Sequence, residues 1–493
     1  MRHSMARLGP TLTGASHRTA LAASARRVAC GLAALALVSL PAAGADLSGN
    51  FGDCCADLEE RIAELEASTA RRGNRPLALT VSGHINEALL AWHDGEDTDV
   101  YVVTNAHSTD RFRFAGRARF SSNLSAGFRI ELGLGLPSTA GVDQFSDDRS
   151  FGSLSVRYAL WYVSSRRLGS VTVGQAPPAT DDIIAYNLGH TNVAGAADTA
   201  LLGGNLFTRD ATVAGNAGLN SLSSGNTISL RWRRFVPGLD TGPANIVRYD
   251  SPILHGFALS ASWGEDDQWD VALRFARDFG RIRIAGGIGY LENREEEAFT
   301  FGWPSGGDGD PAVSTGDTIV RDVKGSASIL DEHTGLFAAA AYVHRSYAGS
   351  DLGVSNFACF ASPDAAAIRA AGIACANRPD LDYVYVQAGL RRKFMPVGKT
   401  AFFAEYAQAR DGITGLNVAV SSAVGGDLDF VTDSRMEIWG LGVVQRIDAA
   451  AMELYASWRH FSADVSGIEA SGVRRIAPIE DAHVFLAGSR IRF

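Results

Sequence analysis

Long hydrophobic runs are scarce in this sequence of 493 residues. Hydrophobic residues make up 46% of the chain and the mean hydropathy is +0.01, so apolar residues are too few for a bundle of membrane-spanning helices. Proline is also scarce, with 15 residues against 53 glycines, and this balance favours many strands and turns. The composition fits either a soluble protein or a barrel that shows lipid only alternate residues.

Motifs of catalysis and metal binding are missing as well. The chain has no H-E-x-x-H, no G-x-S-x-G and no phosphate-binding loop, and its 11 histidines are dispersed. Asp308-Gly309-Asp310 lacks the further carboxylates of an EF-hand loop, so we interpret it as a turn. We therefore expect no enzyme, no metal and no cofactor.

The most apolar stretch lies near the N-terminus. Arg26 and Arg27 directly precede the run from Val28 to Leu40, no acidic residue comes before Asp46, and Ala43-Gly44-Ala45 fits a cleavage site. We interpret residues 1–45 as a secretory signal peptide, with an uncleaved anchor as the alternative.

Acidic residues dominate the rest of the chain. Removal of the five arginines of the signal peptide from the 45 basic residues leaves 40 against 54 acidic ones, a net charge of −14. Such a charge argues against a nucleic-acid partner. Only three of the basic residues are lysines. Arginine suits sites that need a permanent charge and a rigid, fork-shaped hydrogen-bond donor. The base composition of a GC-rich genome is the alternative explanation for the excess of arginine.

Four cysteines remain after the signal peptide. Cys359 and Cys375 bracket a polar stretch, and in an oxidising compartment we expect a disulfide between them rather than a metal site. The adjacent Cys54 and Cys55 leave three alternatives open: bonds between chains, a strained ring and free thiols.

Residues 46–76 carry a short helical pattern, which predicts a periplasmic helical or coiled-coil segment. The positions of its seam, spaced by three and four, are Cys55, Leu58, Ile62, Leu65 and Thr69. The segment is too short to be stable as an isolated coiled coil. It is therefore either a lone amphipathic helix or a stalk that joins chains already held together elsewhere.

From Leu77 onward the apolar period changes to two, which predicts strands. The alternation recurs in segments of about ten residues, the length that a tilted strand needs to cross a bilayer. It is found in 108–120, 126–134, 156–162, 257–263, 269–275, 282–290, 336–342, 384–390 and 485–493. Tight turns alternate with long polar connections, as in outer-membrane barrels.

About seventeen strands can be counted in this way, but a single-chain bacterial barrel needs an even number. We exclude Asn226–Phe235, which lies in the longest irregular region, about 176–243. The predicted fold is therefore all-β: a transmembrane antiparallel barrel of sixteen strands over residues 77–493, preceded by the short helix. Such a barrel is wide enough for an aqueous channel.

Four stretches resemble a known family. Residues 245–270 read NIVRYDSPILHGFALSASWGEDDQWD and resemble the strand-turn-strand signature of Gram-negative general porins. The stretches DCCADLEERIAELEAS and LALTVSGHINEALLAW near the start, and the terminal SRIRF, are similar to alpha-proteobacterial porins.

This resemblance implies a homotrimer of barrels for passive diffusion, with the third external loop folded into the lumen. Here that loop would follow Gly169–Gln175, include Ala179–Asp182, reach about Asn226 and lie within residues 176–243. The resemblance also implies that Phe493 is recognised by the barrel-assembly machinery.

A diffusion pore needs fixed charges around a narrow, wet segment. Arg111, Arg113, Arg117 and Arg119 share one face of a strand and are expected to form a cationic wall, with Asp181 and Asp182 on the anionic side. Further lumen candidates are Arg129, Arg157, Arg274, Arg281 and Arg283.

Two alternatives stay open for these residues. The arginines would brace the wall if they paired with carboxylates such as Glu131 or Glu405. Independently of this, an ordinary solvated turn is the alternative for the two aspartates. The acidic net charge favours cations while the arginine strand favours anions, so the sequence leaves the sign of the selectivity open.

The predicted function is a channel for small hydrophilic solutes and ions in the outer membrane of a Gram-negative bacterium, surrounded by its lipids. A channel selective for sugars or anions is the first alternative. A barrel-borne lipase or protease is the second, although no nucleophile and base near the outer rim can be named.

Overall fold

The computed structural model describes residues 77–147, 154–221, 229–264, 267–294, 319–348, 379–415, 418, 420, 428, 430–469 and 473–493. The predicted signal peptide, the helical segment 46–76 and the cysteines Cys54, Cys55, Cys359 and Cys375 lie outside these residues. No helix in the described part of the chain is long and apolar enough to cross a membrane.

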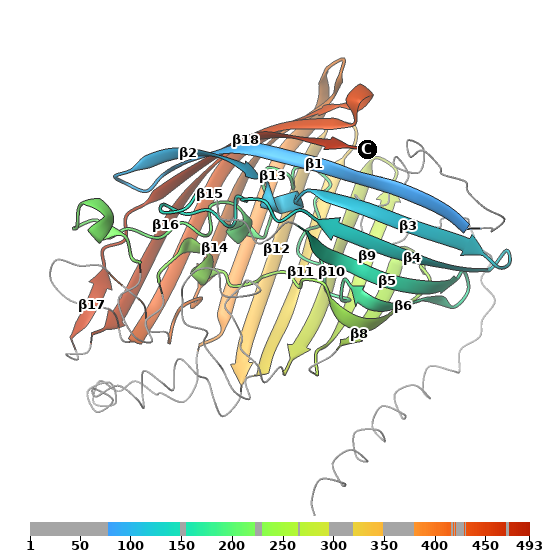
Figure 1. Ribbon diagram of the computed structural model, residues 1–493, viewed down its shortest axis with the longest axis horizontal. Coiled ribbons are helices and arrows are strands. Elements are labelled where there is room, and N and C mark those ends of the chain that lie inside the picture. Colours follow the sequence, from blue (N-terminus) through green and yellow to red (C-terminus); the bar gives the residue numbers. More distant parts are fainter. Residues whose placement is uncertain are drawn as a thin grey trace, which may run out of the picture. The chain divides into compact units, whose positions relative to one another are not determined.

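The described strands form one closed antiparallel barrel (Figure 1). Its wall strands are β1 (Leu77–His93), β3 (Arg111–Arg119), β4 (Leu124–Gly133), β5 (Ser155–Ser165), β6 (Gly169–Ala176), β7 (Ala244–Asp250), β8 (Phe257–Gly264), β9 (Trp269–Phe279), β10 (Ile282–Asn293), β11 (Ile319–Asp331), β12 (Leu336–Ala348), β13 (Leu381–Met395), β14 (Gly398–Arg410), β15 (Phe430–Ile447), β16 (Met452–Ile468) and β18 (Ala482–Arg492). The last strand, β18, pairs with β1 and closes the wall.

The sheet has 18 segments, but two of them continue the line of another strand. β2 (Thr98–Thr104) lies beyond β3 along the same edge of β1, and β17 (Arg474–Ala477) lies beyond β18 along the same edge of β16. Sixteen wall strands remain, which confirms the predicted fold class and strand number.

The alternation of side chains explains why these segments form a barrel wall. Along β13, Tyr383, Tyr385 and Gln387 are buried on the inner face, while Val384 and Val386 are exposed on the outer face. Outward apolar residues suit contact with lipid, and inward ones meet the lumen or whatever fills it. Residues 229–235 of the excluded segment form no wall strand; they include the 3-10 turn η4 (Trp232–Phe235), so their exclusion was correct.

Connections differ at the two ends of the barrel. Tight turns join β3 to β4, β5 to β6, β9 to β10, β11 to β12, β13 to β14 and β15 to β16, and we refer to this as the turn end. Most connections at the opposite, loop end are much longer. In outer-membrane barrels the short turns face the periplasm.

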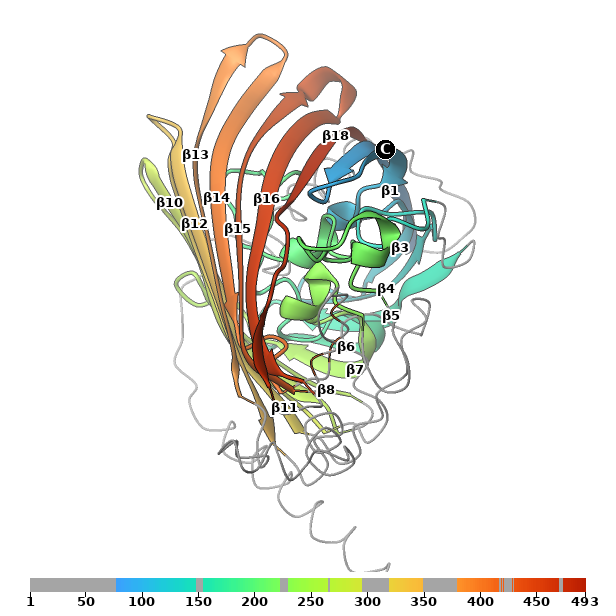
Figure 2. The same ribbon diagram turned by 90° about the vertical axis from the view of Figure 1, so that its left-hand side faces the viewer.

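The longest of the loop-end connections, residues 177–243 between β6 and β7, lies inside the barrel, and we refer to it as the inward loop. Figure 2 shows its green segments between the orange and red strands on one side and β1 on the other. Its described backbone meets successive strands: Ala179 N–H donates to Ser262 Oγ of β8 at 2.9 Å, and Leu188 N–H donates to Ser328 Oγ of β11 at 3.0 Å. Further along, Tyr383 Oη of β13 donates to Ala197 O at 2.6 Å.

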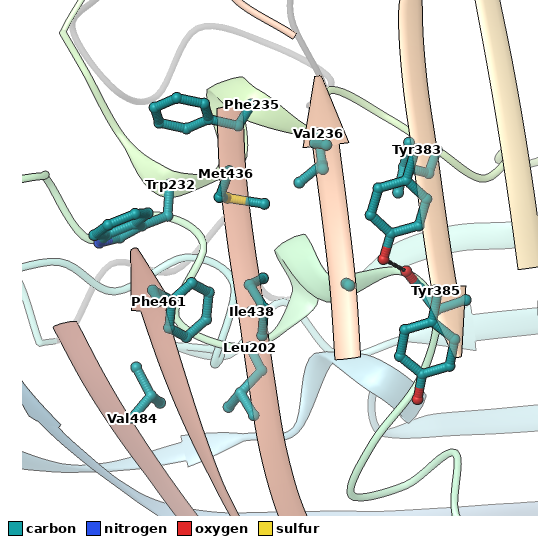
Figure 3. Close-up of a cluster of buried hydrophobic side chains, with 14 of the residues drawn as sticks. Leu202, Trp232, Phe235, Val236, Tyr383, Tyr385, Met436, Ile438, Phe461 and Val484 are labelled. Carbon is teal, nitrogen blue, oxygen red and sulfur yellow. Dashed lines mark hydrogen bonds between the residues drawn. The ribbon is translucent and has the colours of Figure 1, made fainter. Parts of the chain in front are cut away.

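An apolar cluster fixes the later part of the inward loop against the wall (Figure 3). Trp232 and Phe235 pack beside Phe461 and Met436, and the rings of Trp232 and Phe461 are 5.5 Å apart. Leu202 of the same loop is fully buried. Because the cluster excludes water from this side of the lumen, it stabilises the inward loop by the hydrophobic effect.

Cationic side chains of the wall bind carbonyl oxygens at both ends of the inward loop. Arg248 donates to Pro177 O and Pro178 O at 3.1 and 3.0 Å. At the other end, Lys324 donates to Leu239 O at 3.2 Å. Charge-assisted hydrogen bonds of this kind are stronger than neutral ones, so both ends of the inward loop are held firmly.

Candidate functional site

A cavity of about 1380 Å³ lies between the inward loop and the inner faces of the wall. Residues of the inward loop line it together with residues of the wall, which come mainly from β1, β3, β5, β9 to β12, β15, β16 and β18. Charged side chains are concentrated on both sides, and their arrangement determines what the cavity can admit.

Of the eight arginines that line the cavity, five lie on β3, β5 and β18, and we refer to them as the basic band: Arg111, Arg113, Arg157, Arg490 and Arg492. The closure of the barrel brings them together, since Arg111 of β3 and Arg492 of β18 both lie opposite His84 of β1. The band therefore joins residues from the two ends of the chain.

Glu131 of β4 holds three members of the basic band. Its side chain is fully buried and lies 3.2 Å from Arg111 Nη1, 2.9 Å from Arg113 Nη2 and 3.0 Å from Arg157 Nε. One carboxylate among three guanidinium groups leaves a formal charge of +2. The arginines therefore brace the wall and line the cavity at the same time, which combines the two interpretations left open by the sequence.

Glu453 of β16 holds the other two members. Its Oε2 lies 2.7 Å from Arg490 Nη2 and 3.1 Å from Arg492 Nη2. Sequence reasoning missed these two arginines, although a signal was present: Arg490-Ile491-Arg492-Phe493 repeats the alternation of Arg111-Phe112-Arg113-Phe114.

Four aspartates of the inward loop line the cavity. Asp198 is one of them, and the other three interact with one another: Asp181, Asp182 and Asp240. The backbone N–H of Asp182, whose φ is +56°, donates to Asp240 Oδ1 at 3.1 Å. Asp240 was also missed from sequence, because it lies 58 positions after Asp182 and only the fold of the inward loop brings the two together.

The pKa values of these carboxyl groups are raised. Withdrawal from bulk water inside the barrel and repulsion from Asp182 and Asp240 raise the pKa of Asp181 well above its usual range. The same withdrawal raises the pKa of Asp182, against attraction from Arg111 and Arg157. Burial and the charge of Asp182 raise the pKa of Asp240 to about 7. At neutral pH the loop side therefore carries less than its full formal charge.

A model of the Gram-negative porin family matches residues 31–466. The chain belongs to this family. As a porin it forms a channel for passive diffusion across the outer membrane. A comparison with curated protein sequences gives no match.

Solved structures with a similar fold include several outer-membrane proteins. The trimer form of OmpT from Vibrio cholerae is 14% identical, with a TM-score of 0.47 over 85% of this chain and 100% of that chain. An anion-selective porin from Comamonas acidovorans is 14% identical, with a TM-score of 0.48 and the same coverage of 85% and 100%. OmpF of Salmonella typhi, in complex with daunomycin, is 12% identical, with a TM-score of 0.42 over 86% and 100%.

Several of the predicted site residues of this porin lie away from the cavity. Arg117 and Arg119 are exposed at the turn end of β3 and do not line it. Arg281 pairs with Asp331 at 3.2 Å, and Arg283 pairs with Asp278 at 3.0 Å, both beside turns. Of the remaining candidates, Arg129 lies over the ring of Tyr158 at 6.0 Å, outside the cavity lining.

Arg274 is a further predicted arginine that does line the cavity, and it contacts the inward loop. Its Nη2 donates to Ala179 O at 2.6 Å and to Asp181 O at 3.0 Å. Arg274 thus orients the backbone that carries the acidic pair. In the part of the chain that the structure describes, no group of three or more His, Cys, Asp or Glu side chains is placed to hold a metal ion.

Proposed function

We propose that the constriction of this porin lies between the basic band and the three aspartates of the inward loop, and that it prefers anions. The observation that carries this proposal is the imbalance of fixed charge. Nine arginines and lysines line the cavity against seven aspartates and glutamates, with Glu131 bound to three of the arginines. The raised pKa values of Asp181, Asp182 and Asp240 reduce the negative charge of the inward loop further near pH 7.

Opposed charges across a narrow, wet segment create a transverse field. Such a field orients dipolar solutes and disfavours apolar ones, and the excess of one sign sets the ion preference. The acidic net charge of the chain acts mainly at the surface, where salt screens it within about 10 Å. The lining of the constriction should therefore dominate the selectivity.

Reconstitution into a planar bilayer tests the proposal. In a KCl gradient the reversal potential should indicate a preference for chloride, and Arg113→Gln combined with Arg157→Gln should shift it toward potassium. Arg281→Gln is the matched control, because this arginine lies at the turn end and is largely exposed. A preference for potassium in the wild type, or equal shifts in test and control, would refute the assignment.

We also infer that the porin assembles as a homotrimer. β2 pairs with β1 along one edge, and along its other edge the described residues form only the bridge from Thr104 to Ser138. Val100 and Val102 on β2 are 56% and 72% exposed. Unpaired backbone facing lipid is costly, so a neighbouring copy is the suitable cover. Sedimentation in detergent should give three chains per particle, and Val102→Arg should give monomers; trimers from that variant would contradict this interface.

Phe493 follows β18, the strand that closes the barrel by pairing with β1. Its N–H donates to Gly83 O at 3.0 Å, and its ring lies 5.7 Å from that of Phe112. We infer that the barrel-assembly machinery recognises this terminal aromatic before the seam closes. Deletion of Phe493 should reduce the amount of folded protein in the outer membrane severalfold, measured by heat-dependent gel mobility. Unchanged amounts would contradict this role.

A further inference from the structure

The basic band consists of two separate patches. The Glu131 patch contains Arg111, Arg113 and Arg157, and the Glu453 patch contains Arg490 and Arg492. Each patch is assembled around its own carboxylate, which the arginines of the patch outnumber. The cavity therefore presents two centres that attract anions, rather than one diffuse positive surface.

His84 lies between the two patches on β1. Arg111 and Arg492 are its direct cross-strand neighbours on either side. Adjacent strands are about 4.8 Å apart, so the backbones of these two arginines are separated by roughly 10 Å. That separation suits two charged groups joined by a short carbon chain.

A single short segment fixes the positions of both patches. Arg490 Nη1 donates to Ser108 Oγ at 3.0 Å, and Arg111 Nε donates to Thr109 O at 3.0 Å. His84 Nε2 lies 3.1 Å from Ser108 Oγ and 3.0 Å from Thr109 O. Arginines from β18 and β3 are thus tied to neighbouring residues just before β3, and the distance between the patches is set by the structure rather than by flexible side chains.

We propose that this cavity binds solutes with two anionic groups on a short chain, such as α,ω-dicarboxylates, with one group on each patch. This inference rests on the proposed anion preference of the constriction and specifies its preferred solute. A solute that binds both patches should bind more tightly than one that binds a single patch. Once its first anionic group is bound, the second binds without a further loss of translational freedom. A solute whose two charges are adjacent reaches only one patch.

Block of the chloride current tests the proposal. Dicarboxylates from malonate to suberate are added at constant ionic strength, and the concentration that halves the current is measured for each. We expect an optimum at intermediate chain length, with inhibition about tenfold stronger than by malonate or by a monocarboxylate, since a tenfold change corresponds to about 1.4 kcal/mol. Equal inhibition by all dianions would overturn two-point binding.

Paired variants separate this inference from the proposed function. Arg490→Gln with Arg492→Gln, or Arg113→Gln with Arg157→Gln, should each abolish the chain-length optimum, and the four substitutions together should add little to that loss. Ser108→Ala should weaken the optimum, because Ser108 positions Arg490, while Arg281→Gln, outside the cavity, should change neither the optimum nor the reversal potential. A channel that prefers chloride but shows no optimum overturns only the dianion site, whereas a preference for potassium overturns the proposed function itself.

Discussion

Replacement of Trp232 by alanine should detach the later part of the inward loop without unfolding the barrel. Trp232 is 1% exposed, and its ring lies 5.5 Å from Phe461 and 6.2 Å from Phe235. Truncation of a buried tryptophan to alanine costs about 3–5 kcal/mol. The hydrogen-bonded ladder between β15 and β16 is unaffected, so the cost falls on docking of the inward loop.

A loss of about 3 kcal/mol raises the population of the detached loop roughly a hundredfold, and a larger loss raises it further. Limited proteolysis of the folded protein measures that population, because cleavage follows transient opening when opening is fast. Cleavage between residues 203 and 240 should accelerate by that factor, and the single-channel current should become noisier. Trp263→Ala is the matched control, since Trp263 is 60% exposed on the outer face. Equal cleavage rates in the two variants would show that the apolar cluster does not hold the inward loop.

Three further predictions concern the charges. The anion preference should rise as pH falls from 8 to 5, because carboxyl groups with raised pKa values, including Asp240 at about 7, take up protons in that range; Asp240→Asn should flatten the pH dependence of the reversal potential. Glu131→Gln should lower the free energy of unfolding by about 3 kcal/mol, since it leaves three partly buried guanidinium groups without their shared counter-charge, and thermal unfolding in detergent should reveal a lower midpoint. Arg248→Gln removes charged hydrogen bonds to Pro177 O and Pro178 O, each contributing about 1.5–3 kcal/mol, so proteolysis should become faster at the start of the inward loop; an unchanged rate would contradict this anchoring.

The wall of the barrel was predictable from sequence because it depends on the alternation of residues within each strand, which is a local pattern. Alternation along each strand sets which residues face lipid, and the requirement for an even strand number justified the removal of Asn226–Phe235. The composition of the cavity was less predictable. Arg111 and Arg117 share a face of β3, but six residues of strand span roughly 20 Å, which carries Arg117 past the cavity.

Contacts that form only when the barrel closes could not be predicted from the alternation of apolar and polar residues. Arg492 meets the same residue of β1 as Arg111 only because the last strand pairs with the first in one particular register. Asp240 reaches Asp182 only because the inward loop crosses the lumen and returns. Neither contact produces a periodic pattern in the sequence. The alternation of arginines at the C-terminus does identify β18 as a strand with arginines on one face.

The two buried carboxylates explain how a wet channel keeps a defined charge pattern. An arginine side chain that is free in water samples many rotamers and pairs with different anions. Fixing it in one arrangement therefore costs side-chain entropy. Glu131 and Glu453 bind the guanidinium groups of the arginines, so the positive charge at the lumen has a fixed geometry. Each carboxylate binds more than one arginine, so it orders these side chains although they outnumber it. The proposed anion preference thus depends on arginines that outnumber the carboxylates which order them. A variant that adds a second carboxylate to one of these groups should lose the anion preference while retaining the fold.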